Sequence, residues 1–261
     1  MKWRKPMKRF LELVIKGIPV GMSNTLPGVS GGTMALVLNI YKELIDAFKL
    51  IKIKFLFPVF IGGMSGVFLG SWTVTGFLER WPYLTGAFLA GLILASSKVT
   101  LEKSGSFNIK KLFLGIGGLL IAYFTAGSLM AGSGEFVPSL LRYFLGGVTG
   151  SMAMILPGVS GGTLLIVFGV YQGVLEAIRS LNFLVIFIFG GGVGLGLILF
   201  SWLLSYLLEE FPELIMSFLT GLIIGSVRNV IPPVMGFAEA LAAAGGALFI
   251  FLLIYLEKRA V

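Results

Sequence analysis

The sequence LPGVSGGT at residues 26–33 recurs without a change at residues 156–163. An eight-residue identity at a spacing of 130 residues indicates an internal duplication in this chain of 261 residues. Each copy places proline, glycine, serine and threonine in the middle of an apolar stretch. Within a membrane, backbone broken in this way is tolerated only where it is buried in protein or lines a cavity. The two copies therefore predict a site.

The composition predicts an all-α integral membrane protein. Hydrophobic residues make up 57% of the chain and charged residues 12%, and the mean hydropathy is +0.99. These values exclude a soluble globular domain. Several uncharged runs are long enough to cross about 30 Å of hydrocarbon as helices.

The duplication extends well beyond the octapeptide, because Tyr41 matches Tyr171 and Trp72 matches Trp202 at the same spacing. We predict a first repeat over residues 1–131 and a second over residues 140–261. Each repeat is expected to consist of a broken helical hairpin followed by three transmembrane helices. The hairpins are expected at 10–48 and 140–178, and the spans at 55–78, 81–100, 112–131, 182–208, 212–231 and 239–256.

The lengths of the hairpin legs predict a fold with inverted topology. The second hairpin divides into legs of about 14 and 16 residues, only ~20–25 Å long at 1.5 Å per residue. Such legs suit a re-entrant loop, although two tilted full spans are an alternative. A hairpin returns to its side of entry and three spans reverse the chain, so the second repeat is expected to run upside down.

The distribution of charge supports this topology. With both termini in the cytoplasm, the segments predicted to lie inside carry 16 of the 20 lysines and arginines, as the positive-inside rule requires. The basic start of the chain is therefore expected to be a retained cytoplasmic end rather than a signal peptide. The net charge of +8 is attributed to loops that face anionic lipids, not to nucleic-acid binding.

The residues that are missing limit the chemistry. The chain has no cysteine and no histidine, which removes thiolate metal sites, the commonest general base and the commonest transition-metal ligand. We expect no metal, no cofactor and no enzymatic activity. A membrane enzyme such as a lipid phosphatase and a non-transporting scaffold are the alternatives from other functional classes.

The motif itself predicts an anion site. Ser30 and Ser160 stand where N-caps are wanted ahead of two helices. The glycines leave the first N–H groups of these helices unshielded, and the helix dipole favours a phosphate or carboxylate there. Alternatively, the small residues only let two hairpin backbones pass closely. The residues predicted to bind phosphate in the motifs are Ser30, Gly31, Gly32, Thr33, Ser160, Gly161, Gly162 and Thr163.

Three further residues are candidates for the same site. Asn24 precedes the first motif and is expected to reach a ligand or to cap a helix, whereas its counterpart is Met154. Arg142 and Arg179 flank the second hairpin on the predicted outer side. They are expected either to collect a phosphate from the outer leaflet or to snorkel to the interface.

Two patterns predict packing rather than function. Glu12 and Lys16 are four residues apart on the entering helix and are expected to form an ion pair. Two groups of glycines are expected to pack helices tightly, namely Gly62, Gly63 and Gly66, matched with Gly190, Gly191 and Gly194.

At the twin LPGVSGGT motifs, and over nearly its whole length, the chain resembles the bacterial polyprenyl-phosphate transporters of the PopT type, formerly a domain of unknown function. The resemblance implies transport of undecaprenyl phosphate, the lipid carrier of cell-wall synthesis. The implied direction is from the outer to the inner leaflet of the bacterial cytoplasmic membrane, which recycles the carrier. The expected partners are thus polyprenyl phosphate and membrane lipids. No role of an individual residue is taken from the resemblance.

The physical argument agrees on the class of ligand. A phosphate of about −1.5 to −2 charge would be very costly to place in hydrocarbon alone, so its transport requires a polar pocket within the membrane. Coupling to protons or sodium ions is compatible with this scheme, but the sequence assigns no site to it. The alternative is a transporter of another anionic lipid or of a small organic anion.

Overall fold

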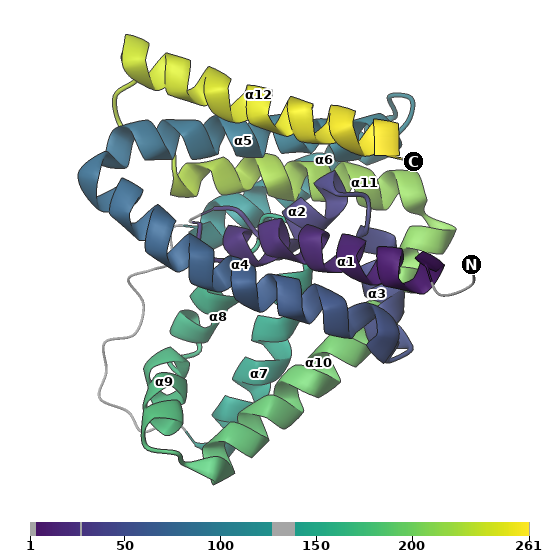
Figure 1. Cartoon of the computed structure of the whole chain (residues 1–261), viewed down its shortest axis with the longest axis vertical. Coiled ribbons are helices and arrows are strands. Elements are labelled where there is room, and N and C mark those ends of the chain that lie inside the picture. The colour runs from purple at the N-terminus through teal and green to yellow at the C-terminus, as the bar shows by residue number, and fades with distance from the viewer. Residues whose placement is uncertain (1–3, 27, 127–138, 261) are drawn as a thin grey trace.

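Every regular element in the computed structural model, which describes residues 4–26, 28–126 and 139–260, is a helix (Figure 1). The first half contains α1 (Arg4–Ser23), α2 (Gly31–Val37), α3 (Tyr41–Lys49), α4 (Ile53–Arg80), α5 (Pro82–Lys103) and α6 (Ile109–Ala126). The second half contains α7 (Leu140–Ile155), α8 (Gly161–Val167), α9 (Tyr171–Arg179), α10 (Phe183–Glu210), α11 (Pro212–Ser226), the 3-10 turn η1 (Val227–Asn229) and α12 (Phe237–Ala260). The prediction of an all-α protein is confirmed.

The backbone takes the same unusual conformations at equivalent positions of the two halves. Positive φ angles recur in pairs that are separated by the spacing of the motif. The pairs are Gly28 and Gly158 (74° and 77°), Asn39 and Gly169 (55° and 66°), and Ile51 and Leu181 (49° and 52°). The inverted orientation of the second half and the re-entrant depth of the hairpins stay predictions.

The returning leg of each hairpin is two short helices instead of one. Asn39 ends α2 in the left-handed conformation, with its N–H donating to the Leu36 carbonyl and the Ile40 N–H donating to the Ala35 carbonyl. This is the hydrogen-bond pattern of a Schellman cap, and Gly169 ends α8 in the same way. The helices after the motifs therefore have seven residues, and nine-residue helices follow them.

Four of the six predicted spans are helices long and apolar enough to cross a membrane. These are α4, α5, α10 and α12, and the 28 residues of α4 and of α10 extend about 42 Å each. The predicted spans 112–131 and 212–231 correspond to the shorter helices α6 and α11, of 18 and 15 residues. Residues 127–131 lie outside the described residues.

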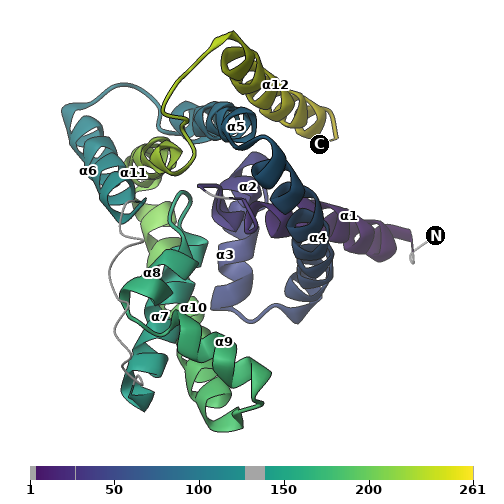
Figure 2. The same cartoon turned by 90° about the vertical axis from the view of Figure 1, so that its left-hand side faces the viewer.

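The helices of the two halves are paired reciprocally. Within each half the entering helix packs on the first long helix, α1 on α4 and α7 on α10. Between the halves, α5 packs on α12 and α11 packs on α6 (Figures 1 and 2). The core lies where α5 and α11 meet the first motif, and it includes the fully buried Ile93, Leu219 and Leu222. The motifs thus lie against α5 and α11, one helix from each of these two pairs.

In each half, the entering helix and the long helix contact each other at glycines. A Cβ on Gly62 would lie 2.0 Å from the Val14 carbonyl oxygen, and one on Gly192 would lie 2.2 Å from that of Phe144. The predicted match of the two glycine groups does not use the 130-residue spacing of the duplication, at which the equivalent of Gly62 is Gly192. Tight packing is confirmed at Gly62 and Gly66, where a Cβ would lie 2.0 Å from a backbone oxygen. The prediction is wrong at Gly190, Gly191 and Gly194, where in the described part of the chain a Cβ would meet nothing within 4 Å.

Ion pairs gather at the end of the molecule where both described ends of the chain lie (Figure 1). Lys16 pairs with Glu12 at 3.2 Å, which confirms the predicted ion pair, and it also pairs with Glu257 of α12. Lys111 pairs with Glu213, an acidic residue that fits a positive-inside loop poorly on its own. All these pairs join segments predicted to lie in the cytoplasm.

Replacing Gly192 with leucine should destabilise the protein, because the side chain has backbone within 2.2 Å and cannot be accommodated without separating α7 from α10. We expect a loss of at least about 1–3 kcal/mol, measured as a lower midpoint of thermal unfolding in detergent. Gly190→Leu on the same helix is the matched control, since its side chain meets open space. Equal midpoints for the two variants would contradict this packing.

Candidate functional site

The two copies of the motif contact each other directly through Ser30. Its hydroxyl oxygen accepts a hydrogen bond from the Gly158 N–H at 3.0 Å and donates one to the Leu156 carbonyl at 3.3 Å. The same oxygen accepts from the Thr33 N–H at 3.2 Å, which confirms the predicted N-cap. Tyr41 adds a hydrogen bond from its hydroxyl to the Ile155 carbonyl at 3.2 Å. The first motif therefore binds the broken backbone of the second.

Glycine is required at the turn of each motif. Gly28 and Gly158 have φ angles of 74° and 77°, which L side chains adopt only with strain. A Cβ on Gly158 would also lie 2.4 Å from the Leu222 carbonyl oxygen of α11. The turn thus brings the backbone of the motif into contact with a core helix.

The helix that follows the first motif is capped by Asn24. The Gly31 N–H donates to the Asn24 side-chain oxygen at 3.2 Å, and the amide nitrogen of Asn24 donates to the Val20 carbonyl. Of the two roles expected for Asn24, the structure shows helix capping. Its counterpart Met154 has no oxygen to accept from Gly161, so the first N–H of α8 lacks an equivalent cap.

A polar cavity of about 420 Å³ lies between the two motifs. Ser160, directly before α8 in the second motif, is exposed there, whereas Ser30 on the opposite wall is buried. The predicted site residues that line the cavity are Asn24, Ser30, Ser160, Gly161 and Gly162.

Asn229 also lines this cavity and was missed by the sequence analysis. It lies in η1, after α11. Its equivalent in the first half is Val99, so the duplication gives no signal for it. The only sequence signal is an amide in a segment that is otherwise largely apolar.

Five other candidates, all among the described residues, do not line the cavity. Gly31, Gly32 and Thr33 are buried in α2 behind it. Arg142 and Arg179 are exposed near the start of α7 and at the end of α9, and the 13 residues from Arg142 to the end of α7 extend about 20 Å. The side chain of Thr163 lies outside the described residues.

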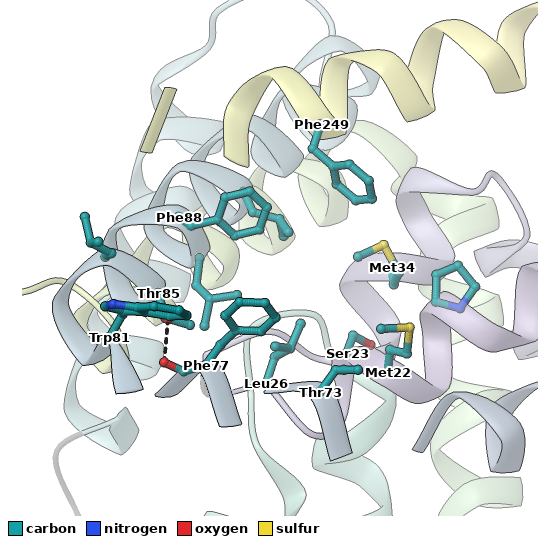
Figure 3. A pocket seen from close by; sticks show the side chains of 14 residues that line it. Met22, Ser23, Leu26, Met34, Thr73, Phe77, Trp81, Thr85, Phe88 and Phe249 are labelled. Atoms are coloured by element: carbon teal, nitrogen blue, oxygen red, sulfur yellow. Dashed lines mark hydrogen bonds between the residues drawn. The ribbon is translucent and has the colours of Figure 1, made fainter. Parts of the chain in front are cut away.

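A second cavity, of about 580 Å³, has an apolar wall (Figure 3). It lies among α1, α4, α5 and α12, and Leu26 at the start of the first motif lines both cavities. The hydroxyls of Ser23, Thr73 and Thr85 in its wall donate to backbone carbonyls. The wall therefore offers hydrocarbon, aromatic rings and thioethers to a ligand.

Replacing Ser30 with alanine should destabilise the contact between the motifs, because two buried N–H groups lose their acceptor. We expect a loss of about 1–3 kcal/mol of unfolding free energy, measured by chemical unfolding in detergent. Ser65→Ala is the matched control, since the exposed hydroxyl of Ser65 donates only to Ile61 of its own helix. If both variants unfold at the same denaturant concentration, Ser30 does not hold the motifs together.

Comparison with known proteins identifies the family of this chain. The family described as VCA0040-like, undecaprenyl phosphate translocase-like, matches residues 20–246. A protein of Vibrio cholerae serotype O1 named polyprenyl-phosphate transporter is 30% identical over 243 residues, which cover 85% of this chain and 78% of the relative. One of Staphylococcus aureus with the same name is 32% identical over 241 residues, covering 84% and 85%. No solved structure matches the chain.

The family and both relatives are transporters, which confirms the expectation that the chain is not an enzyme. The long apolar helices agree with a multi-pass membrane protein. The resemblance noted at the motifs is confirmed over most of the sequence, and the chain belongs to the VCA0040-like, undecaprenyl phosphate translocase-like family.

Proposed function

We propose that this protein carries undecaprenyl phosphate from the outer to the inner leaflet of the bacterial cytoplasmic membrane and so recycles the lipid carrier. The observation that carries the proposal is the pair of adjoining cavities, one polar and one apolar, that share Leu26. A lipid phosphate has one polar and one apolar part in direct succession. The names of the two relatives, polyprenyl-phosphate transporter, support the same class of ligand.

In this proposal the phosphate binds in the polar cavity. The groups in its wall that can donate hydrogen bonds are the backbone N–H groups at the start of α8, the Ser160 hydroxyl and the amide of Asn229. Within the described chain, no lysine or arginine lines the cavity. Neutral donors give an anion weaker binding than a buried cation would, which suits a site that must release its ligand on both sides.

The inverted duplication supplies the means of transport. Transporters with inverted repeats expose one central site alternately to the two sides of the membrane by moving one repeat against the other. With both termini in the cytoplasm, the two motifs would enter from opposite faces and form the two sides of one site. Coupling to protons or sodium ions is part of the proposal, with no residue assigned to it.

The apolar cavity favours a lipid over a soluble anion. A small organic acid would need only the polar space between the motifs. Such a substrate would not occupy the apolar cavity of about 580 Å³ beside this space. An isoprenoid chain would occupy it.

Gly162 is the position at which this function is best tested. A Cβ there would have the Ser160 hydroxyl, at 3.8 Å, as its nearest neighbour, whereas a Cβ on Gly161 would collide with Met154 and the Gly150 carbonyl. Gly162→Leu should therefore fold and fill the polar cavity. Cells with only this variant should accumulate undecaprenyl phosphate in the outer leaflet, as measured by leaflet-resolved labelling, to the level of cells without the protein.

Gly190→Leu, at an exposed helix position, is the control and should transport normally. Normal labelling in cells that hold folded Gly162→Leu would remove the polar cavity from the transport path. If cells without the protein show no accumulation in the outer leaflet, the proposed function itself is wrong.

A further inference from the structure

We propose that the apolar cavity binds the first isoprene units of the lipid chain, those next to the phosphate. This inference rests on the proposed function and adds a binding site for the chain to it. Without such a site, the protein would hold only the phosphate and leave the whole chain in the lipid.

The position of the cavity supports this assignment. Leu26 lies in the walls of both cavities, so a phosphate between the motifs would have its first isoprene units beside Leu26. Figure 3 shows Phe88, Phe249 and Met34 around the same space. Thioether and aromatic side chains adapt to irregular apolar ligands, such as a methyl-branched chain.

The size of the cavity limits how much of the chain it holds. Its volume of about 580 Å³ lies within the range of about 300–1,000 Å³ that is usual for small-molecule sites. The rest of a long polyprenyl chain would therefore have to leave the protein. Phe77, Trp81 and Phe249 line the cavity and are also 45–54% exposed, which places an opening to the lipid between the α4–α5 turn and α12.

Thr73→Trp tests the chain site without touching the phosphate site. Thr73 is exposed, lines the apolar cavity and donates its hydroxyl only to Leu69 of its own helix. The bulky ring should weaken binding of farnesyl phosphate to the purified protein at least tenfold, while binding of inorganic phosphate should stay unchanged. Ser65→Trp, two helical turns earlier on α4 and outside the cavity, should change neither.

If Thr73→Trp fails to fold, Phe249→Ala removes one wall of the cavity and should also weaken binding of farnesyl phosphate alone. Unchanged affinity for farnesyl phosphate, or an equal loss for both probes, would overturn the chain site and leave the proposed function intact. If the unmodified protein binds neither probe, the proposed function fails with it.

A different observation, the unequal docking of the two halves, points to a second conformation. Helix α3 of the first half packs on α10 of the second. Lys49 donates to the Ser205 hydroxyl at 3.1 Å and lies 4.8 Å from the Trp202 ring, and Ser205 donates to Asp46 at 3.1 Å. These contacts fasten the first hairpin to the second half.

The equivalent groups are present on α9 of the second half and α4 of the first, but they do not make the equivalent contacts. At the spacing of the duplication, Arg179 corresponds to Lys49, Glu176 to Asp46, and Trp72 to Trp202. Yet Glu176 and Arg179 are exposed, Trp72 is 84% exposed, and α9 packs on α8 and α10 rather than extensively on α4. The charges and the ring are thus present without the contact.

The geometry points to a second conformation in which α8 and α9 dock on the first half and place Arg179 against Trp72. In that state, α2 and α3 would leave the second half, and Lys49 would separate from Trp202. The polar cavity lies beside Ser160 and the start of α8. The exchange would close the cavity there and open a space beside the first motif.

Cross-linking of introduced cysteine pairs tests this exchange without a transport assay. The chain has no cysteine of its own, so only the introduced pairs can react. In membrane vesicles, a short bifunctional thiol reagent should link Lys49→Cys to Trp202→Cys and also, in a second variant, Arg179→Cys to Trp72→Cys. Arg179→Cys with Ser65→Cys is the control pair and should stay unlinked. Linking of only the first pair, with the second no better than the control, would overturn the second conformation.

Discussion

The structure depends on the satisfaction of backbone hydrogen bonds where the chain is not helical. A buried backbone N–H or carbonyl group without a partner costs free energy, and each motif leaves several such groups where its backbone is not helical. The Ser30 hydroxyl pairs with two of them in the opposite motif, and Tyr41 pairs with a third. The second half therefore depends on hydrogen-bond partners that the first half supplies, and the two halves form one folding unit.

Much of this arrangement follows from local sequence. The N-cap at Ser30 and the ion pair of Glu12 with Lys16 were predicted, because capping and pairing at four residues depend only on the spacing along one helix. The unequal burial of Ser30 and Ser160 could not be predicted. The eight residues around them are identical, and only the packing of the two halves distinguishes them.

Other features depended on tertiary structure in the same way. Asn229 reaches the polar cavity because of where α11 ends, and its equivalent in the first half is the apolar Val99. Arg142 has the charge for a phosphate, but the length of α7 separates it from the motif. Gly62 and Gly66 were predicted to pack tightly and do so, whereas the tight contact of Gly192 with Phe144 depends on which helix packs on α10.

The reciprocal pairing of helices also determines the order of assembly. During synthesis α5 is complete at Lys103, but its partner α12 begins only at Phe237. The buried hydroxyl of Thr100 in α5 accepts a hydrogen bond from Thr220 of α11, a helix that is also made later. Helix α5 must therefore enter the bilayer before its partners α11 and α12 exist. The fold can close only after most of the chain has left the ribosome.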